Sequence, residues 1–219
     1  MTWAFTANHS SELLTQTGVH VLLALLPLVF GLIISVPLGW LAARWRVARA
    51  ILIPLGGLLY TIPSIALLII LPVILGTPIV DPVNVVVALT IYTVALLVRA
   101  VADSLASVPA NVLSAANAIG YRRAGRFFGV ELPLSIPVLV AGLRVAAVSN
   151  MSLVSVGALV GIGGLGQLMT EGYNRFIPGE TATAIVAILV LALIIDGLLT
   201  FGGRLLSPWH KASRSGATA

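Results

Sequence analysis

The chain has 219 residues, of which 59% are hydrophobic and 9% are charged, and its formal net charge is +5. Soluble domains average about a quarter charged residues, so this composition excludes a water-soluble globular protein and predicts an integral membrane protein with lipid as its solvent. The absence of cysteine excludes disulfides and thiolate metal sites. Because His9, His20 and His210 are scattered, we expect no metal site, and nothing suggests a nucleic-acid partner.

Five apolar stretches predict an all-α fold with five transmembrane helices in one membrane domain, residues 18–203. Their lengths suit a bilayer with roughly 30 Å of hydrocarbon. They cover residues 18–43, 51–75, 85–102, 135–160 and 181–203. A polar segment, residues 1–17, precedes them without a basic n-region, so we expect no cleaved signal peptide. A basic tail, residues 204–219, follows them.

Prolines predict irregular backbone in the first two spans. Pro27 and Pro37 should kink the first span, while Pro54, Pro63 and Pro72 make the second span irregular. Membrane helices tolerate such interruptions where neighbouring helices satisfy the freed backbone groups.

The positions of arginine and lysine predict the orientation of the chain. With the segment between the third and fourth spans inside, the inner face receives nine of these residues and the outer face receives only Arg175. The nine are Arg44, Arg46, Arg49, Arg122, Arg123, Arg126, Arg204, Lys211 and Arg214. This asymmetry satisfies the positive-inside rule, so we expect the N-terminus outside and the C-terminus in the cytoplasm.

The segment 114–133, SAANAIGYRRAGRFFGVELP, is the longest central stretch that is not continuously apolar. Its pattern predicts two short helical pieces joined at Gly120 and Tyr121. We expect Pro133 to close the segment, and the next helix to begin near Pro137.

This segment resembles the EAA loop in permease subunits of binding-protein-dependent ABC importers. The family pattern is Glu-Ala-Ala, three residues, Gly, nine residues, Ile, one residue and Leu-Pro. The matching positions here are Ala115, Ala116, Gly120, Leu132 and Pro133. Val130 stands for the isoleucine, and Ser114 stands where the family usually has glutamate.

The resemblance implies a type I ABC importer permease fold and a cytoplasmic coupling loop, about residues 107–135, that docks on an ATPase subunit. Arg122, Arg123 and Arg126 could then meet acidic rims of the ATPase or lipid headgroups. The residues expected to take part in coupling are Ser114, Ala115, Ala116, Gly120, Tyr121, Arg122, Phe127, Phe128, Leu132 and Pro133. An ordinary basic loop between membrane helices is the alternative.

Glycines at 161, 163 and 166 spell GxGxxG, but this is not a dinucleotide site. The motif lies at a membrane boundary without a βαβ pattern, and the region about 20 residues on, TAIVAILV, has no acidic residue. At membrane depth, such glycines permit close packing or turns. We expect a translocation path or a dimer contact here, with simple packing as the alternative. The candidate residues are Pro63, Ser64, Gly157, Gly161, Gly163, Gly164 and Gly166.

Ionisable residues within or beside the spans predict two ion pairs. Arg99 and Asp103 are spaced for a local pair on one helix. Arg144 and Asp196 lie in the fourth and fifth spans, and we expect a structural pair between them rather than a proton relay.

Beyond the loop, the resemblance extends over roughly residues 17–209 and is strongest to the osmoprotectant branch. The matching pieces are TIPSIALLIILP, ELPLSIPVLVAGLRVAAV and VGIGGLGQLM. The branch transports glycine betaine, choline, carnitine and related quaternary ammonium compounds. Methionine-type or other amino-acid permeases are the nearest alternative.

The resemblance also implies the assembly: a multi-pass subunit in the cytoplasmic (inner) membrane, two cytoplasmic ATPase subunits, a second permease copy or paralogue, and an extracytoplasmic binding protein. The chain lacks the GxxxxGK[ST] phosphate-binding motif, so we expect no enzyme and no cofactor here, with ATP and Mg²⁺ bound by the ATPase partners. Two rivals predict different features. An ion-coupled secondary transporter would carry paired midplane charges and inverted repeats, and a membrane scaffold would have no ATPase partner.

Overall fold

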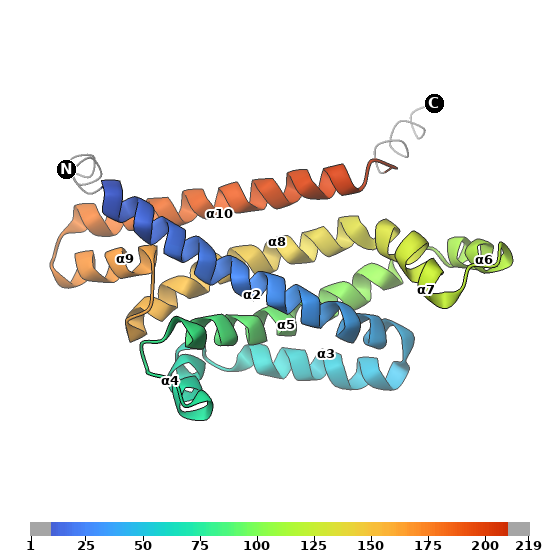
Figure 1. Ribbon diagram of the computed structural model, residues 1–219, viewed down its shortest axis with the longest axis horizontal. Coiled ribbons are helices and arrows are strands. Elements are labelled where there is room, and N and C mark those ends of the chain that lie inside the picture. The colour runs from blue at the N-terminus through green and yellow to red at the C-terminus, as the bar shows by residue number, and fades with distance from the viewer. Residues whose placement is uncertain (1–9, 210–219) are drawn as a thin grey trace.

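The computed structural model describes residues 10–209, and every regular element in that range is a helix. The long helices run along the longest axis of the molecule, and short helices and loops gather at its two ends (Figure 1). Four helices of the described range are long and apolar enough to cross a membrane, or five if one bent pair counts as a span. The predicted all-α membrane fold is therefore confirmed.

The first span, α2 (Ser10–Arg44), begins earlier than predicted. Its polar first turns stay helical, and the hydroxyls of Thr15 and Thr17 donate to carbonyls four residues back. The helix remains unbroken through both of its prolines. The rest of the predicted N-terminal segment, residues 1–9, lies outside the described residues. So do residues 210–219 of the tail, including His210, Lys211 and Arg214.

The second predicted span is a bent pair, α3 (Arg46–Thr61) and α4 (Ser64–Leu75), whose axes differ by 99°. The break falls at Ile62 because Pro63 disfavours helical backbone in the residue before it, and Ile62 is extended. The Tyr92 hydroxyl donates to the Ile62 carbonyl, so the bend is held by the neighbouring helix. Pro54 and Pro72 stay inside their helices.

The helix α5 (Pro82–Ala106) is the centre of the fold and packs most extensively against α2 and α8 (Leu132–Gly157). Asp81 caps it by accepting from the Val83 amide at 2.9 Å. A buried amide joins the three helices: Asn150 Nδ2 donates to Ala24 O at 3.1 Å and to Thr93 Oγ1 at 3.0 Å. Such polar contacts hold membrane helices together where apolar burial cannot.

The loop after α5 contains α6 (Ala110–Ala118), α7 (Arg123–Arg126) and a π-helical turn, η1 (Phe127–Glu131). The expectation that Pro133 closes this segment is wrong, because η1 runs directly into α8 at Leu132. Pro133 lies in the first turn of α8. The helical stretch runs from Arg123 to Val160 without a break, so this proline is accommodated within it and does not end it.

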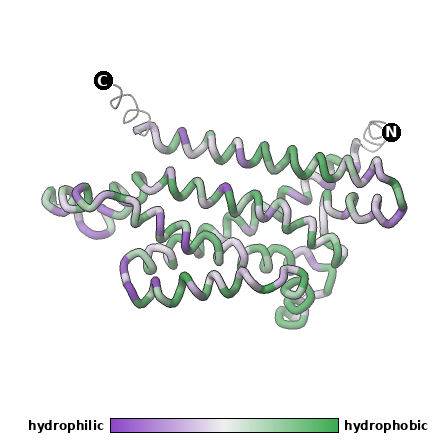
Figure 2. Tube along the Cα trace, turned by 180° about the vertical axis from the view of Figure 1, so that it is seen from behind, coloured by the Kyte–Doolittle hydropathy of each residue, from purple (hydrophilic) through white to green (hydrophobic). Residues whose placement is uncertain are grey.

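The chain then passes through the short η2 (Ala158–Val160) and α9 (Leu165–Asn174) into the last span, α10 (Pro178–Leu206). Hydrophilic residues concentrate toward the two ends of the molecule, while hydrophobic colour dominates the helices between them (Figure 2). On α10 this apolar surface faces outward, because Leu189, Leu193, Leu198 and Phe201 are exposed. The structure therefore presents an apolar girdle that fits a bilayer or a partner subunit.

Candidate functional site

The EAA-like loop lies at one end of the molecule, where α6 and α7 extend beyond the long helices (Figure 1). The turn between α2 and α3 lies at this end too. At the opposite end lie the start of α2, α9 and the start of α10. The two candidate regions predicted from sequence, the loop and the glycine-rich segment, are therefore separated by the length of the helices.

Gly120 forms the turn between the two helical pieces of the loop, as predicted. Its φ is +93°, and the Gly120 and Tyr121 amides donate to carbonyls of α6 at 3.0 and 3.1 Å. An added Cβ would meet no described atom within 4 Å. Glycine is therefore required by the backbone conformation alone, since residues with a Cβ resist a positive φ.

Several apolar side chains of the loop are exposed. Ile119 is 78% exposed and Phe128 is 68% exposed, with Tyr121 beside them at 47%. On α6, Ser114 and Ala115 are also exposed, whereas Ala116 is buried. Exposed apolar groups gathered on a projecting loop are typical of a protein–protein contact.

Phe127 differs from its neighbour Phe128. Its ring packs edge-on against Trp40 of α2, with centroids 6.3 Å apart, and it is half-buried. The two phenylalanines also contact each other, at 5.0 Å between centroids. Phe127 therefore anchors the loop to α2, and Phe128 faces outward.

The three arginines of the loop do not share one role. Arg122 and Arg123 are exposed, as a partner contact requires. The expectation that Arg126 meets an ATPase rim or lipid headgroups is wrong, because its side chain is buried and its Nε donates to Glu131 Oε1 at 2.6 Å. Its Nη1 donates to Asn117 Oδ1, also at 2.6 Å.

Sequence reasoning missed Asn117 and Glu131. The signal available was a lone acidic residue, Glu131, in a strongly basic segment beside an apolar span. A buried carboxylate there needs a cationic partner, and the three arginines nearby are the obvious candidates. Which arginine it pairs with depends on the backbone geometry of η1.

The glycine-rich segment at the other end packs tightly within the chain. A Cβ on Gly164, whose φ is +46°, would lie 2.7 Å from the backbone nitrogen of His20. A Cβ on Gly166 would lie 2.7 Å from the Cα of Ser155. The His20 ring is fully buried, and its Nε2 lies 3.0 Å from the Met151 carbonyl oxygen. These glycines let α9 approach α2 and α8.

The remaining residues of this candidate set lie near the same end. Gly157 packs against the Ile162 carbonyl, and an added Cβ on Gly163 would lie 2.6 Å from the Ala158 Cβ. Gly161 has φ +85° and lies beside Val80. Pro63 and Ser64 flank the bend before α4, and α4 contacts η2. The path or dimer role of the set stays a prediction.

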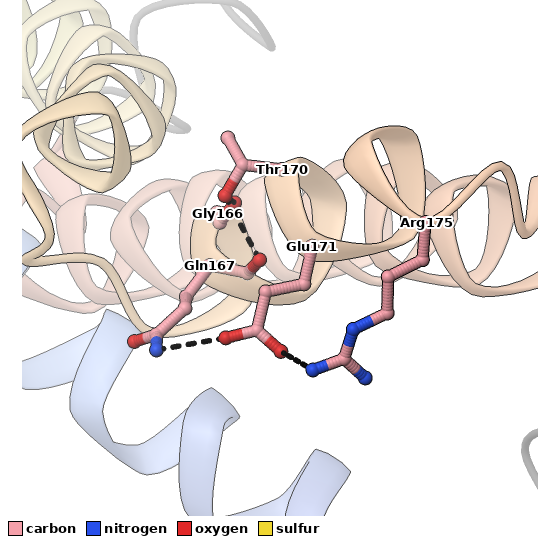
Figure 3. Close-up of polar contacts among 5 residues, drawn as sticks. All are labelled: Gly166, Gln167, Thr170, Glu171 and Arg175. Carbon is pink, nitrogen blue, oxygen red and sulfur yellow. Dashed lines mark hydrogen bonds and ion pairs between the residues drawn. The ribbon is translucent and has the colours of Figure 1, made fainter.

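The polar face of α9 is satisfied along its own helix (Figure 3). Glu171 accepts from Gln167 Nε2 at 3.0 Å and pairs with Arg175 at 3.4 Å. Thr170 Oγ1 donates to the Gly166 and Gln167 carbonyls. Arg175, the lone cation expected on the outer face, is thus accompanied by a carboxylate.

An apolar groove of about 440 Å³ opens between α8, α9 and α10. Its hydroxyl groups come from Ser152 and Ser155 of α8. The rest of its lining consists of Val148, Met151, Val156, Leu159, Met169, Ile185, Ile188, Leu189 and Ala192. No aromatic side chain lines this groove within the described residues, so it lacks the usual means of holding a quaternary ammonium group.

The charged residues of the spans form two interhelical pairs. Arg144 and Asp196 make a bidentate contact between α8 and α10, at 2.7 Å from Nε to Oδ1 and 2.6 Å from Nη2 to Oδ2. The predicted local pair of Arg99 with Asp103 is wrong, because Asp103 accepts from Arg49 of α3 at 2.6 Å. The packing of α3 on α5 brings that guanidinium within reach, and this interhelical contact replaces the local one, which is weak.

Comparisons with known proteins identify the class. Residues 35–209 match the model of the binding-protein-dependent transport system inner membrane component. This match covers most of the chain, and the chain belongs to that family of ABC transporter permeases. The ion-coupled secondary transporter and the membrane scaffold considered from sequence are therefore not supported.

The chain is 30% identical over 204 residues to the choline transport system permease protein OpuBB of Bacillus subtilis (strain 168), with 93% of each protein covered. It is 31% identical to the glycine betaine/carnitine/choline transport system permease protein OpuCB of the same organism, with the same coverage. Among solved structures, a chain of the MetNI methionine ABC transporter in an inward-facing conformation matches with TM-score 0.73 and 26% identity. That match covers 91% of this chain and 96% of the other.

Proposed function

We propose that this chain is the transmembrane subunit of an ATP-driven importer for a quaternary ammonium osmoprotectant such as glycine betaine, choline or carnitine. The observation that carries the proposal is the near full-length similarity to OpuBB and OpuCB, whose names give these solutes. The substrate itself is expected to be selected in a separate binding protein, since the groove between α8 and α10 has no aromatic lining among the described residues.

The proposed assembly contains two permease subunits, this chain with a second copy or a paralogue, and two cytoplasmic ATPase subunits. An extracytoplasmic binding protein delivers the solute. ATP and Mg²⁺ are bound by the ATPases. Support comes from the family description, which names binding-protein dependence, and from the exposed apolar groups on the projecting loop.

The proposed orientation places the loop in the cytoplasm, with the N-terminus outside. The end of the molecule that carries α6 and α7 holds the α2–α3 turn with Arg44 and Arg46, together with the exposed Arg122 and Arg123. Such clustering of arginines is typical of cytoplasmic faces. The loop then lies on the side of the membrane that contains ATP.

The proposed mechanism uses the loop as the mechanical link. Closure of the ATPases on ATP would move α6, which would move the long helices and switch the path from inward to outward access. Chemistry stays in the ATPases, and this chain contributes position and movement. Such coupling requires only that the inward-facing and outward-facing states of the permease have different affinities for its partners.

A methionine or other amino-acid importer is the second candidate, because MetNI is among the structural matches. Both classes share the fold, so the substrate must be decided by transport. The test is ATP-dependent uptake in proteoliposomes that contain the complex and its cognate binding protein. The radiolabelled solutes are glycine betaine, choline, carnitine and methionine.

We expect uptake of at least one quaternary ammonium solute and none of methionine. Uptake of methionine alone would contradict the proposed substrate and favour the second candidate. The control is the same complex without binding protein, which should transport none of the four solutes.

A further inference from the structure

A buried ion pair spans the π-helical turn at the base of the loop. Arg126 and Glu131 are only 8% and 6% exposed, and their Nε–Oε1 distance is 2.6 Å. Burial of two charges is costly unless geometry and further hydrogen bonds compensate for it. This pair therefore differs from an ordinary surface ion pair.

The π-turn is what allows this pair to form. In an α-helix of 3.6 residues per turn, residues five apart point about 140° away from each other. Hydrogen bonds in a π-turn run between residues five apart, and here the Leu132 amide donates to the Phe127 carbonyl. Arg126 and Glu131 are also five apart. The turn thus places them on one face, and the pair in return opposes conversion of the turn to α-helix.

Further contacts join this pair to other elements. The Arg126 Nη1 donates to Asn117 on α6, and Arg44 at the end of α2 lies 3.9 Å from Glu131. The helix α6 packs chiefly on α7 and η1. A displacement of α6 therefore reaches α8 through the residues around this ion pair.

We propose that Arg126 and Glu131 are positioning residues that hold the π-turn and transmit the movement of α6 to α8. Asn117 ties α6 to them. The proposal rests on the proposed function, since it concerns how ATPase movement reaches the membrane helices. It predicts that weakening the network uncouples transport from ATP hydrolysis without dispersing the complex.

The test uses the complete importer in proteoliposomes with two mild variants, Glu131→Gln and Asn117→Ala. Asn117 is exposed, so its replacement leaves the fold in place even if Glu131→Gln lowers expression. The matched control is Asp103→Asn. It breaks another 2.6 Å arginine–carboxylate pair, which is half-exposed and joins α3 to α5.

Three quantities are measured for each variant: subunit stoichiometry, basal ATPase rate, and its stimulation by solute-loaded binding protein. We expect both network variants to keep stoichiometry and basal rate while the stimulation and the solute moved per ATP fall roughly fivefold or more, the size of a coupled contact. A charge-exchanged variant, Arg126→Glu with Glu131→Arg, should recover part of this loss. The control should behave as the unmodified protein.

Two results would overturn the inference. One is unchanged stimulation in both network variants. The other is a loss that only follows loss of assembled complex, because that marks a purely structural role. Failure of the unmodified complex to respond to loaded binding protein would instead contradict the proposed function, so the two failures are distinguishable.

Discussion

Gly120 and Gly164 both have a positive φ, yet they stand in opposite surroundings at opposite ends of the molecule. At Gly120 an added Cβ would meet no described atom within 4 Å. At Gly164 it would lie 2.7 Å from the His20 nitrogen and 2.8 Å from the Gln16 carbonyl oxygen. The first glycine shapes a projecting loop, and the second lets a helix pack into the core.

The two glycines show that a positive φ serves packing inside the chain at one end of the molecule and a projecting loop at the other. In the glycine-rich segment, the glycines contact other helices of the same chain. In the EAA-like loop, Ile119, Tyr121 and Phe128 have exposed apolar surface that the chain itself leaves uncovered. Such exposed apolar surface is typical of a contact with a partner protein. Changes at one end should therefore affect folding, and changes at the other should affect coupling.

The largest expected effect is on folding, from Gly164→Ala. The methyl group would overlap backbone of α2, and the positive φ would add strain. Overpacking and strain together cost about 2–4 kcal/mol, so we expect a large loss of folded protein. Thermal unfolding of detergent-solubilised protein, followed by size-exclusion fluorescence, measures this.

Gly18→Ala is its matched control. Gly18 lies on α2 near the same contact, and an added Cβ would meet nothing within 4 Å. A glycine-to-alanine change inside a helix alters stability by about 1 kcal/mol at most, in the favourable direction. Equal stability of the two variants would mean that the segment is not packed as described.

Gly120→Val should abolish transport while the protein still inserts and folds. Valine resists the φ of +93°, so the turn and the direction of α7 should change, but no membrane helix is touched. The expected cost in stability is about 1–3 kcal/mol and is confined to the loop. Uptake and ATPase activity of the reconstituted complex are the measurements.

Gly120→Asn provides the comparison, because asparagine enters the left-handed region more readily than valine does. It should retain more uptake than the valine variant. Normal substrate-stimulated ATPase in Gly120→Val would show that the conformation of this turn is not needed for coupling.

The two neighbouring phenylalanines of the loop should affect different properties, one the stability of the protein and the other its binding to the ATPase. Phe127→Ala removes the packing on Trp40 and should lower thermal stability by about 1–2 kcal/mol. Phe128→Ala should change stability by about 0.5 kcal/mol or less, yet weaken ATPase binding by about 1–2 kcal/mol if it fills a partner pocket. Thermal unfolding and titration of the ATPase subunit separate them, and identical profiles would contradict the division.

Sequence reasoning reached the helices and the loop because hydropathy and spacing are local signals. The 99° angle of the break before Pro63 could not be predicted from the sequence, since proline predicts an interruption but packing sets its angle. The helix within the glycine-rich segment, α9, was not anticipated as an element.

The ion-pair partners were also only partly predictable from the sequence. Arg144 and Asp196 were paired correctly by their depth in two spans. Asp103 was assigned to Arg99 on its own helix, whereas Arg49 reaches it from a neighbouring helix. Arg126 was assigned to a partner together with the other two arginines of the loop. The π-helical turn that brings its side chain to Glu131 has no clear sequence signal.

We expect the ATPase to dock on the EAA-like loop and not on the opposite end of the molecule. The chain has no cysteine, so Ile119→Cys and Tyr173→Cys each provide a single thiol, at positions 78% and 76% exposed. Crosslinking with a short bifunctional thiol–amine reagent is measured in membranes that contain the assembled importer. We expect a covalent product with the ATPase from Ile119→Cys and none from Tyr173→Cys. A product from Tyr173→Cys alone would contradict docking on the loop.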